Sequence, residues 1–174
     1  MGLTIGVDID NCLNNLTEAI LSVYNADSGD NLSLSDITAY HIENFVKPSY
    51  RENFWHYFLD KRVWKRISII DGCREVIAKL YNEGHTIIFI TTTEAENLPK
   101  KKNWLQRNFP FLEIRKCLYS CPRKQYIKCD ILIDDCLNTI PYVLLIRGIQ
   151  PNQKNQFQCS PEQRTGMKSI TRSR

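Results

Sequence analysis

Short apolar segments alternate with amphipathic segments along much of this chain, and the alternation limits the folds available to it. Four segments have the length of short buried strands: residues 3–7, 86–90, 115–120 and 129–133. Between them, apolar residues recur at helical spacing, as in the stretch that ends at Gly84. Strands that alternate with helices form βαβ units around a parallel sheet. We therefore predict an α/β, Rossmann-like core in which helices flank a parallel sheet.

One segment interrupts the alternation. Residues 15–68 are rich in aromatic side chains and indicate short helices, so we predict a small helical cap inserted after the first strand. Residues 1–14 and 69–150 would form the core, with a further strand at 142–146. Residues 151–174 carry five basic side chains and one acidic one, and we predict a basic, polar and flexible tail.

Composition restricts the partners and the compartment. The whole chain has a net charge of +4, and the tail accounts for all of it, so the neutral body gives no reason to expect a nucleic-acid partner. No apolar run approaches the ~20 residues of a membrane span, and no signal-peptide start is seen. Seven cysteines without a CxxC pair argue against a disulfide framework or a zinc site. We expect a soluble, cytoplasmic protein and leave its oligomeric state open.

Polar side chains cluster where the predicted strands end. They are Asp8 and Asp10 after the first strand, Thr91 and Thr92 after the second, Lys124, and Asp134 and Asp135 after the fourth. Ligands of open parallel sheets bind at this edge. Two acidic pairs can hold one hard divalent cation, for which oxygen ligands favour Mg²⁺ over zinc, while a hydroxyl and a lysine bind phosphate oxygens. Each motif alone also fits a turn or a surface charge, but their joint occurrence favours phosphoryl transfer.

The order of these motifs resembles that of the haloacid dehalogenase-like superfamily. The matching segments are IGVDID (5–10), IIFIT (87–91), Lys124 and DILIDD (130–135). Lys124 lies six residues before Asp130, and the segment KKNWL at 101–105 adds a second local likeness. Both features are similar to the 5′(3′)-deoxyribonucleotidase family, cytosolic type C. The resemblance covers roughly residues 3–150, and Cys12 departs from it, standing where the superfamily usually has Thr or Val.

This resemblance implies a phosphatase that dephosphorylates (deoxy)nucleoside 5′(3′)-monophosphates through an aspartyl-phosphate. Asp8 would be the nucleophile that attacks phosphorus. Asp10 would protonate the leaving oxygen and then activate the hydrolytic water. Thr91 and Lys124 would hold the phosphoryl oxygens, with Thr92 as an alternative to Thr91. The expected partner is thus a small phosphate ester.

The resemblance also implies Mg²⁺ as the cofactor. Its ligands would be the carboxylate of Asp8, the backbone carbonyl of Asp10 and the terminal acidic pair. Asp135 is favoured as the direct ligand and Asp134 as close support, although the sequence does not separate them.

In that family the cap closes over the substrate and supplies aromatic contacts to the base. Seven aromatic residues lie between positions 45 and 64, and most of them must form the cap's own core. We expect Phe45 and Trp55 to contact the substrate.

Two alternative functions stay open. A phosphatase for another small phosphorylated metabolite would carry the same motifs and differ only in its cap. A non-catalytic phospho-receiver-like or regulatory domain also combines an acidic cluster with Thr and Lys on a parallel sheet. Its acidic pair precedes the phosphorylated aspartate, however, whereas Asp134 and Asp135 come last here.

Overall fold

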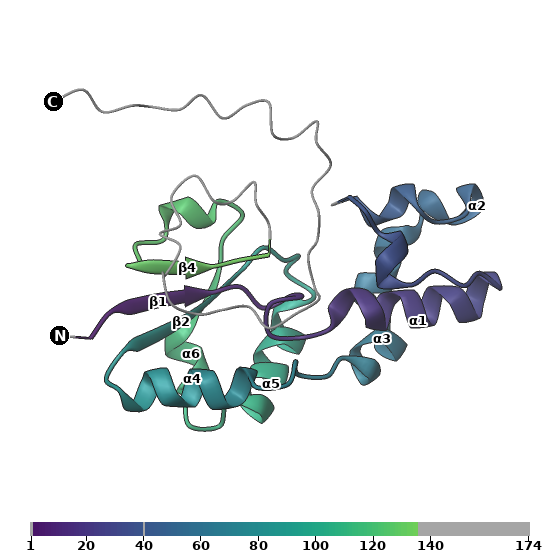
Figure 1. Cartoon of the computed structure of the whole chain (residues 1–174). Helices are drawn as coiled ribbons and strands as arrows, with labels where there is room; N and C mark the ends of the chain where they lie inside the picture. Colours follow the sequence, from purple (N-terminus) through teal and green to yellow (C-terminus); the bar gives the residue numbers. More distant parts are fainter. Residues whose placement is uncertain (1, 40, 136–174) are drawn as a thin grey trace, which may run out of the picture.

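A parallel four-stranded sheet, in the order β3-β2-β1-β4, forms the centre of the molecule (Figure 1). The computed structural model describes residues 2–39 and 41–135. The strands are β1 (Thr4–Val7), β2 (Thr86–Thr91), β3 (Leu118–Ser120) and β4 (Ile131–Ile133). All three strand pairs are parallel. The predicted α/β fold with a parallel sheet is confirmed.

The two central strands, β1 and β2, consist of continuous apolar runs. Ile5 and Val7 of β1 are buried, as are residues 87–90 of β2. Runs without a polar face are typical of parallel strands that are covered on both sides. Ile5 is in register with Ile87 on one side and with Ile131 on the other, so β1 lies inside the sheet.

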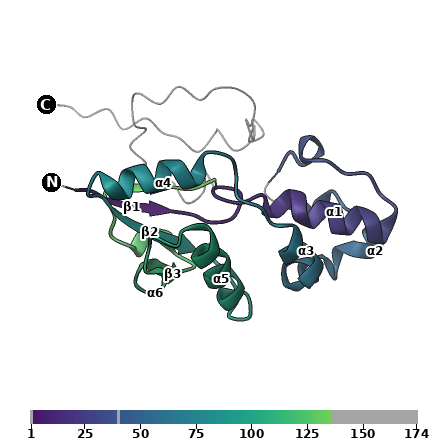
Figure 2. The same cartoon turned by 90° about the horizontal axis from the view of Figure 1, so that it is seen from below.

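Three helices of the core lie along one face of the sheet, below it in Figure 1 and toward the viewer in Figure 2. They are α4 (Cys73–Asn82), α5 (Leu98–Asn108) and α6 (Ile114–Cys117). After α4 the chain turns at Gly84, whose φ of 85° lies in the left-handed region that favours glycine. Trp104 and Leu105 of α5 are buried, as their spacing predicts.

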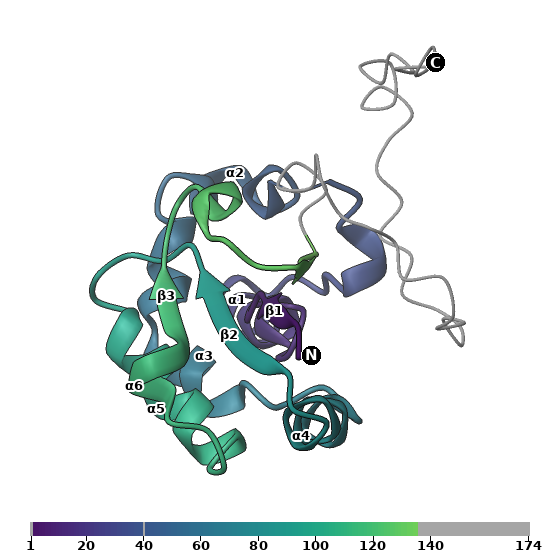
Figure 3. The same ribbon diagram turned by 90° about the vertical axis from the view of Figure 1, so that its left-hand side faces the viewer.

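The predicted strand at 115–120 is only half right. Its first part is the last turn of α6, and only Leu118–Ser120 form β3, which is labelled in Figure 3. The reason is the burial of Ile114 and Cys117, since residues three apart share a face in a helix but not in a strand.

The predicted helical cap inserted after the first strand is confirmed. Its helices are α1 (Leu16–Ser28), α2 (Pro48–Arg51) and α3 (Lys61–Arg66), with 3₁₀ turns η1 (Leu34–Asp36), η2 (Ile42–Asn44) and η3 (Phe54–Leu59). They form a lobe beyond the carboxyl end of β1 (Figures 1 and 2). The two chain segments that join the lobe to the core pair with each other, because the N–H of Asn15 donates to Ser68 O and the N–H of Ile70 donates to Leu13 O. This pairing holds the lobe beside the edge of the sheet where the acidic motifs lie.

Tyr24 is the centre of the cap. It is fully buried, and its ring meets those of Tyr50, Phe54 and Tyr57 at centroid distances of 5.5, 6.1 and 6.1 Å. Its hydroxyl donates to the Asp30 carboxylate at 2.7 Å and accepts from the Lys47 N–H at 2.9 Å. One side chain of α1 therefore binds both the loop that follows α1, at Asp30, and the residue that precedes α2, Lys47.

We expect Tyr24→Phe to lower the free energy of unfolding by about 1–3 kcal/mol, because it leaves the partly buried Lys47 N–H without its acceptor. Urea unfolding of the whole chain measures the change. Tyr81→Phe is the control, since Tyr81 is 44% exposed and its hydroxyl makes no hydrogen bond within the described residues. Equal stability of the two variants would contradict the role given to the Tyr24 hydroxyl.

The domain boundaries at residues 14, 68 and 150 stay a prediction. The predicted strand at 142–146 and the tail at 151–174 lie outside the described residues. In the part of the chain that the structure describes, no helix combines the length and the apolar character needed to cross a bilayer.

Candidate active site

The carboxyl ends of β1, β2 and β4 bring the predicted acidic motifs and Thr91 to one edge of the sheet. Asp8 follows β1, and its N–H donates to Ile133 O of β4 at 2.8 Å, which extends the strand pairing by one residue. Asp134 and Asp135 follow Ile133 directly, and Thr91 is the last residue of β2. The fold thus assembles residues that are more than 120 positions apart in the sequence.

Lys124 joins Asp8 and Asp134. It lies in the 3₁₀ turn η4 (Lys124–Tyr126), before β4, and its Nζ is 2.7 Å from Asp8 Oδ1 and 2.8 Å from Asp134 Oδ2. Asp8 and Lys124 are only 5% and 6% exposed. A buried ammonium between two carboxylates forms strong charge-assisted hydrogen bonds, and its single positive charge offsets part of the two negative charges.

Burial dominates the electrostatics of this cluster. Desolvation raises the pKa of Asp8 to about 7, although the Lys124 ammonium acts in the opposite direction. Desolvation also acts to lower the pKa of Lys124, but the charges of Asp8 and Asp134 outweigh it and raise that pKa above its usual range. A further cation at this edge would favour the ionised form of Asp8.

A second buried lysine, Lys101 of α5, contacts Asp10 and Thr91. Its Nζ contacts the Asp10 carboxylate and donates to the Thr91 hydroxyl at 2.6 Å. Lys101 is 3% exposed, whereas the neighbouring Lys102 is exposed. Each of the first two motif aspartates therefore has a buried lysine of its own.

Lys101 was not among the predicted site residues, but the sequence carries a signal for it. In the run of three lysines at 100–102, only Lys101 lies three and four residues before Trp104 and Leu105. That spacing puts it on the buried face of α5. A lysine at a core-facing helix position needs a buried partner, and Asp10 and Thr91 supply one.

Two asparagines fix the turn that follows β1. Asn14 is buried; its Oδ1 accepts from the N–H groups of Asn11 and Leu16, and its Nδ2 donates to Asp10 Oδ1 at 3.3 Å. Asn11 has a φ of 56°, and its Nδ2 donates to Asp135 Oδ2 at 3.4 Å. The turn thus orients a carboxylate from each acidic motif. No asparagine was predicted to take part in the site, because only the folded turn shows what these amides contact.

The two candidate threonines differ in their surroundings. Thr91 is fully buried and its hydroxyl meets Lys101, inside the cluster. Thr92 is exposed and its hydroxyl donates to Cys121 O at 3.2 Å. The geometry therefore brings Thr91 together with the motif aspartates and leaves Thr92 on the outside.

The cap residues Phe45 and Trp55 stay predictions as substrate contacts. Phe45 is partly buried against the hydrophobic core. Trp55 is 54% exposed, and its ring stacks on Phe58 with 5.1 Å between centroids. An exposed indole on the cap is free to meet a ligand, and a partly buried phenyl ring is less so.

Three side chains could hold a cation. One donor atom from each of Asp8, Cys12 and Asp135 lies within 4.8 Å of the other two. Carboxylate oxygens suit Mg²⁺, so Asp8 and Asp135 fit the predicted ligand set, while Asp134 is bound by Lys124 beside them. Desolvation, with a further contribution from the Asp8 charge, raises the pKa of the Cys12 thiol well above its usual range. Cys12 is thus a neutral thiol at the edge of an oxygen-lined site.

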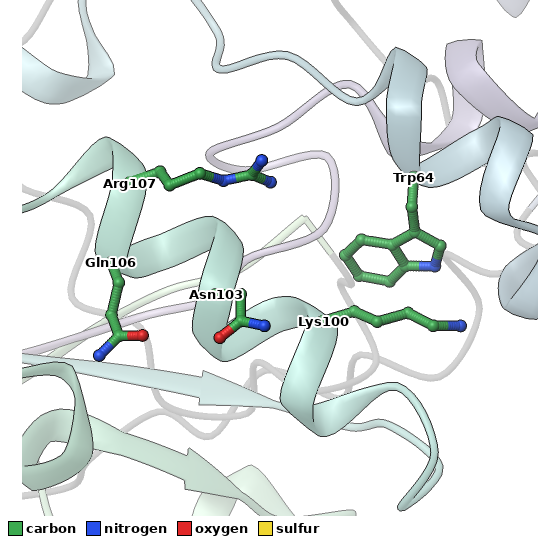
Figure 4. Close-up of a pocket in the computed structure, with 5 residues that line it drawn as sticks. All are labelled: Trp64, Lys100, Asn103, Gln106 and Arg107. Atoms are coloured by element: carbon green, nitrogen blue, oxygen red, sulfur yellow. The ribbon is translucent and has the colours of Figure 1, made fainter.

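A groove of about 510 Å³ runs between the cap and the core. Figure 4 shows its lining residues: Trp64 of α3, and Lys100, Asn103, Gln106 and Arg107 of α5. Lys100 bridges the two sides, because its Nζ donates to Leu59 O at 3.0 Å and lies 5.7 Å from the centre of the Trp64 ring. No member of the carboxylate cluster lines this groove.

The sequence of this chain matches one known family and several named relatives. Residues 2–156 match the model of the family described as 5′ nucleotidase, deoxy (pyrimidine), cytosolic type C protein. The chain is 28% identical over 135 residues to a 5′(3′)-deoxyribonucleotidase from Clostridium acetobutylicum, a match that covers 76% of this chain and 72% of the relative. A 5′(3′)-deoxyribonucleotidase from Bacillus subtilis is 26% identical over 141 residues, with 80% of each chain covered.

Solved structures also match, at lower similarity. A putative phosphatase from Clostridium difficile is 18% identical with a TM-score of 0.45, and the match covers 69% of this chain and 60% of that one. A hydrolase from Pseudomonas syringae is 13% identical with a TM-score of 0.43, covering 67% and 58%. The chain therefore spans about three fifths of the length of these structures.

Proposed function

This chain belongs to the family of cytosolic type C deoxy (pyrimidine) 5′-nucleotidases, a family of phosphatase enzymes, and we propose that it hydrolyses (deoxy)nucleoside 5′(3′)-monophosphates with Mg²⁺ as cofactor. The predicted family resemblance is confirmed by this membership. The observation that carries the proposal is the pairing of each motif aspartate with its own buried lysine, Asp8 with Lys124 and Asp10 with Lys101. Two adjacent carboxylates with different partners can perform different steps of one reaction.

In this proposal Asp8 attacks the phosphorus atom and forms an aspartyl-phosphate, while the bond to the nucleoside oxygen breaks. Asp10 gives its proton to that leaving oxygen and then takes a proton from the water that hydrolyses the aspartyl-phosphate. Lys124 and Thr91 would hold the phosphoryl oxygens, and the contact of Lys124 with Asp8 supports its part in this. The Lys101 ammonium, which contacts both Asp10 and Thr91, would orient these two side chains.

The residues that would hold Mg²⁺ are Asp8, Asp135 and the backbone carbonyl of Asp10, with Asp134 in support. The spacing of Asp8 and Asp135 supports this assignment. The bound ion would supply positive charge that offsets the negative charge of the phosphate. The cap residues Phe45 and Trp55 would contact the nucleoside; the exposure of Trp55 supports its part in this.

A phosphate-release screen with the full chain tests the proposal. The substrates are deoxynucleoside and ribonucleoside monophosphates, sugar phosphates and p-nitrophenyl phosphate, each with Mg²⁺ and with a chelator. We expect Mg²⁺-dependent release with a preference for deoxynucleoside monophosphates. A preference for a sugar phosphate would replace the nucleotidase proposal by that of a phosphatase for another metabolite. The absence of any Mg²⁺-dependent release would favour the non-catalytic alternative.

Lys101→Met should lower the turnover rate by about 10²-fold, since loss of one preorganised donor at a reacting charge costs roughly that much. The variant also leaves the partly buried Asp10 without its counter-charge. Lys102→Met is the matched control, one position along α5 and exposed, and we expect it to retain wild-type turnover. Steady-state assays on both variants, at saturating substrate, make the comparison; similar rates in the two would refute the role of Lys101.

A further inference from the structure

Cys12 is a sulfur donor within the carboxylate site. Its Sγ and one oxygen from each of Asp8 and Asp135 lie within 4.8 Å of one another. These three residues come from the end of β1, from the turn that follows it and from the segment after β4. The cluster therefore differs from an ordinary acidic surface patch, because the fold brings a soft ligand and two hard ligands to one point.

The turn that carries Cys12 is held firmly. Its next residues, Leu13 and Asn14, are 3% and 1% exposed, and both N–H groups donate to Ile9 O. The backbone carbonyl of Cys12 accepts from the Cys73 thiol at 3.6 Å. Within the described residues, the Cys12 sulfur itself has no hydrogen-bond partner and no disulfide. The backbone around Cys12 is thus held in place, and no hydrogen bond to a described residue engages its sulfur.

Ligand chemistry decides which ions would use this sulfur. Mg²⁺ takes oxygen ligands and gains nothing from a thiol. Zn²⁺ and Cd²⁺ bind thiolate strongly, and a sulfur and an oxygen on one tetrahedral zinc lie about 3.5 Å apart. The Asp135 side chain is exposed, and its rotation can bring its carboxylate oxygen from within 4.8 Å of the Cys12 sulfur to the shorter separation that a shared ion requires.

We propose that Cys12 makes this site a binding site for thiophilic divalent cations, in which Asp8, Cys12 and Asp135 together bind Zn²⁺ or Cd²⁺ in competition with Mg²⁺. On binding, the thiol releases its proton to water and becomes a thiolate ligand. Asp8 is then engaged with an ion that also holds sulfur, which blocks the productive arrangement. The inference rests on the proposed function, because it concerns the same cation site.

The test is a titration of the metal-free, reduced full chain with Cd²⁺, followed by the ultraviolet thiolate-to-cadmium charge-transfer band. We expect the band to saturate at one Cd²⁺ per chain and to weaken when excess Mg²⁺ is added. Cys12→Ser should lose the band, and its Cd²⁺ affinity should fall by more than the roughly 10–100-fold typical of losing an outer-shell partner. Cys73→Ser is the control and should keep the band, because the Cys73 sulfur lies outside the group of Asp8, Cys12 and Asp135, and its one hydrogen bond in the described part of the chain is to the Cys12 carbonyl.

A ¹¹³Cd NMR spectrum of the wild-type chain reads sulfur ligation without any substitution, so the test does not depend on the folding of a variant. A shift typical of oxygen-only ligation, a band that persists in Cys12→Ser, or a band that Mg²⁺ does not weaken would each overturn the inference. Mg²⁺-dependent phosphate release is measured on the same wild-type sample. Release without a cadmium–thiolate band defeats this inference alone, and a band without release defeats the proposed function alone.

Discussion

Asp8→Asn is expected to abolish phosphate release, with a loss of at least about 10⁴-fold in turnover, since an amide cannot replace a carboxylate nucleophile. The residual rate is measured as phosphate release from deoxynucleoside monophosphates at high enzyme concentration. The effect is the largest we expect, because every later step depends on the bond that Asp8 forms.

The variant should remain folded. The side-chain oxygen of asparagine can still accept from Lys124, and Lys124 keeps its contact with Asp134 at 2.8 Å. Thermal unfolding of the variant checks this point. Asp71→Asn, which changes an exposed carboxylate by the same chemical step, is the control and should retain wild-type turnover. Measurable wild-type-like release by Asp8→Asn would remove Asp8 from the role of nucleophile.

The second large effect concerns Asp10. Asp10→Asn removes the proton donor and the base, so turnover should fall by about 10²–10⁴-fold. The effect should depend on the step: p-nitrophenyl phosphate has a good leaving group and needs no proton, so the aspartyl-phosphate should still form and then persist. Intact-protein mass spectrometry after mixing with this substrate measures the trapped phosphoenzyme.

The double variant Asp8→Asn/Asp10→Asn is the control for that experiment. It lacks the attacking carboxylate and should show no phosphoenzyme, which places any trapped phosphate on Asp8. Trapping in the double variant would point to another phosphorylated residue. Full turnover without trapping in Asp10→Asn would assign the proton transfers to a different group.

Much of the framework follows from sequence alone, for a local reason. The continuous apolar runs at β1 and β2 are typical of strands in a parallel sheet that is buried on both faces. In such a sheet the carboxyl ends of the strands lie at one edge. Asp8, Thr91 and Asp134 occupy strand ends, so their meeting could be predicted without coordinates. The aromatic segment after β1 could likewise be predicted to form a helical cap, because it lacks the alternation of the core.

Contacts between separate elements could not be predicted in this way. No local sequence feature distinguishes Asp134 from Asp135. Lys124 contacts Asp134 because of the position of η4 relative to β4. The pairing of Lys101 with Asp10 depends on the rotation of α5 against the sheet. The first half of the predicted strand at 115–120 is helical, because Ile114 and Cys117 are both buried and only a helical turn puts them on one face.

The sequence by itself thus determined a parallel α/β core, a helical cap and a set of acidic, hydroxyl and lysine side chains at one sheet edge. Periodicity and strand order decide these features, and both are properties of the chain as written. Only the tertiary structure decided which lysine contacts which aspartate, and that the Cys12 sulfur lies within 4.8 Å of a carboxylate oxygen of both Asp8 and Asp135. The physical reason is that charge pairing and ligand geometry act over a few ångströms between residues far apart in sequence, and packing alone sets those distances.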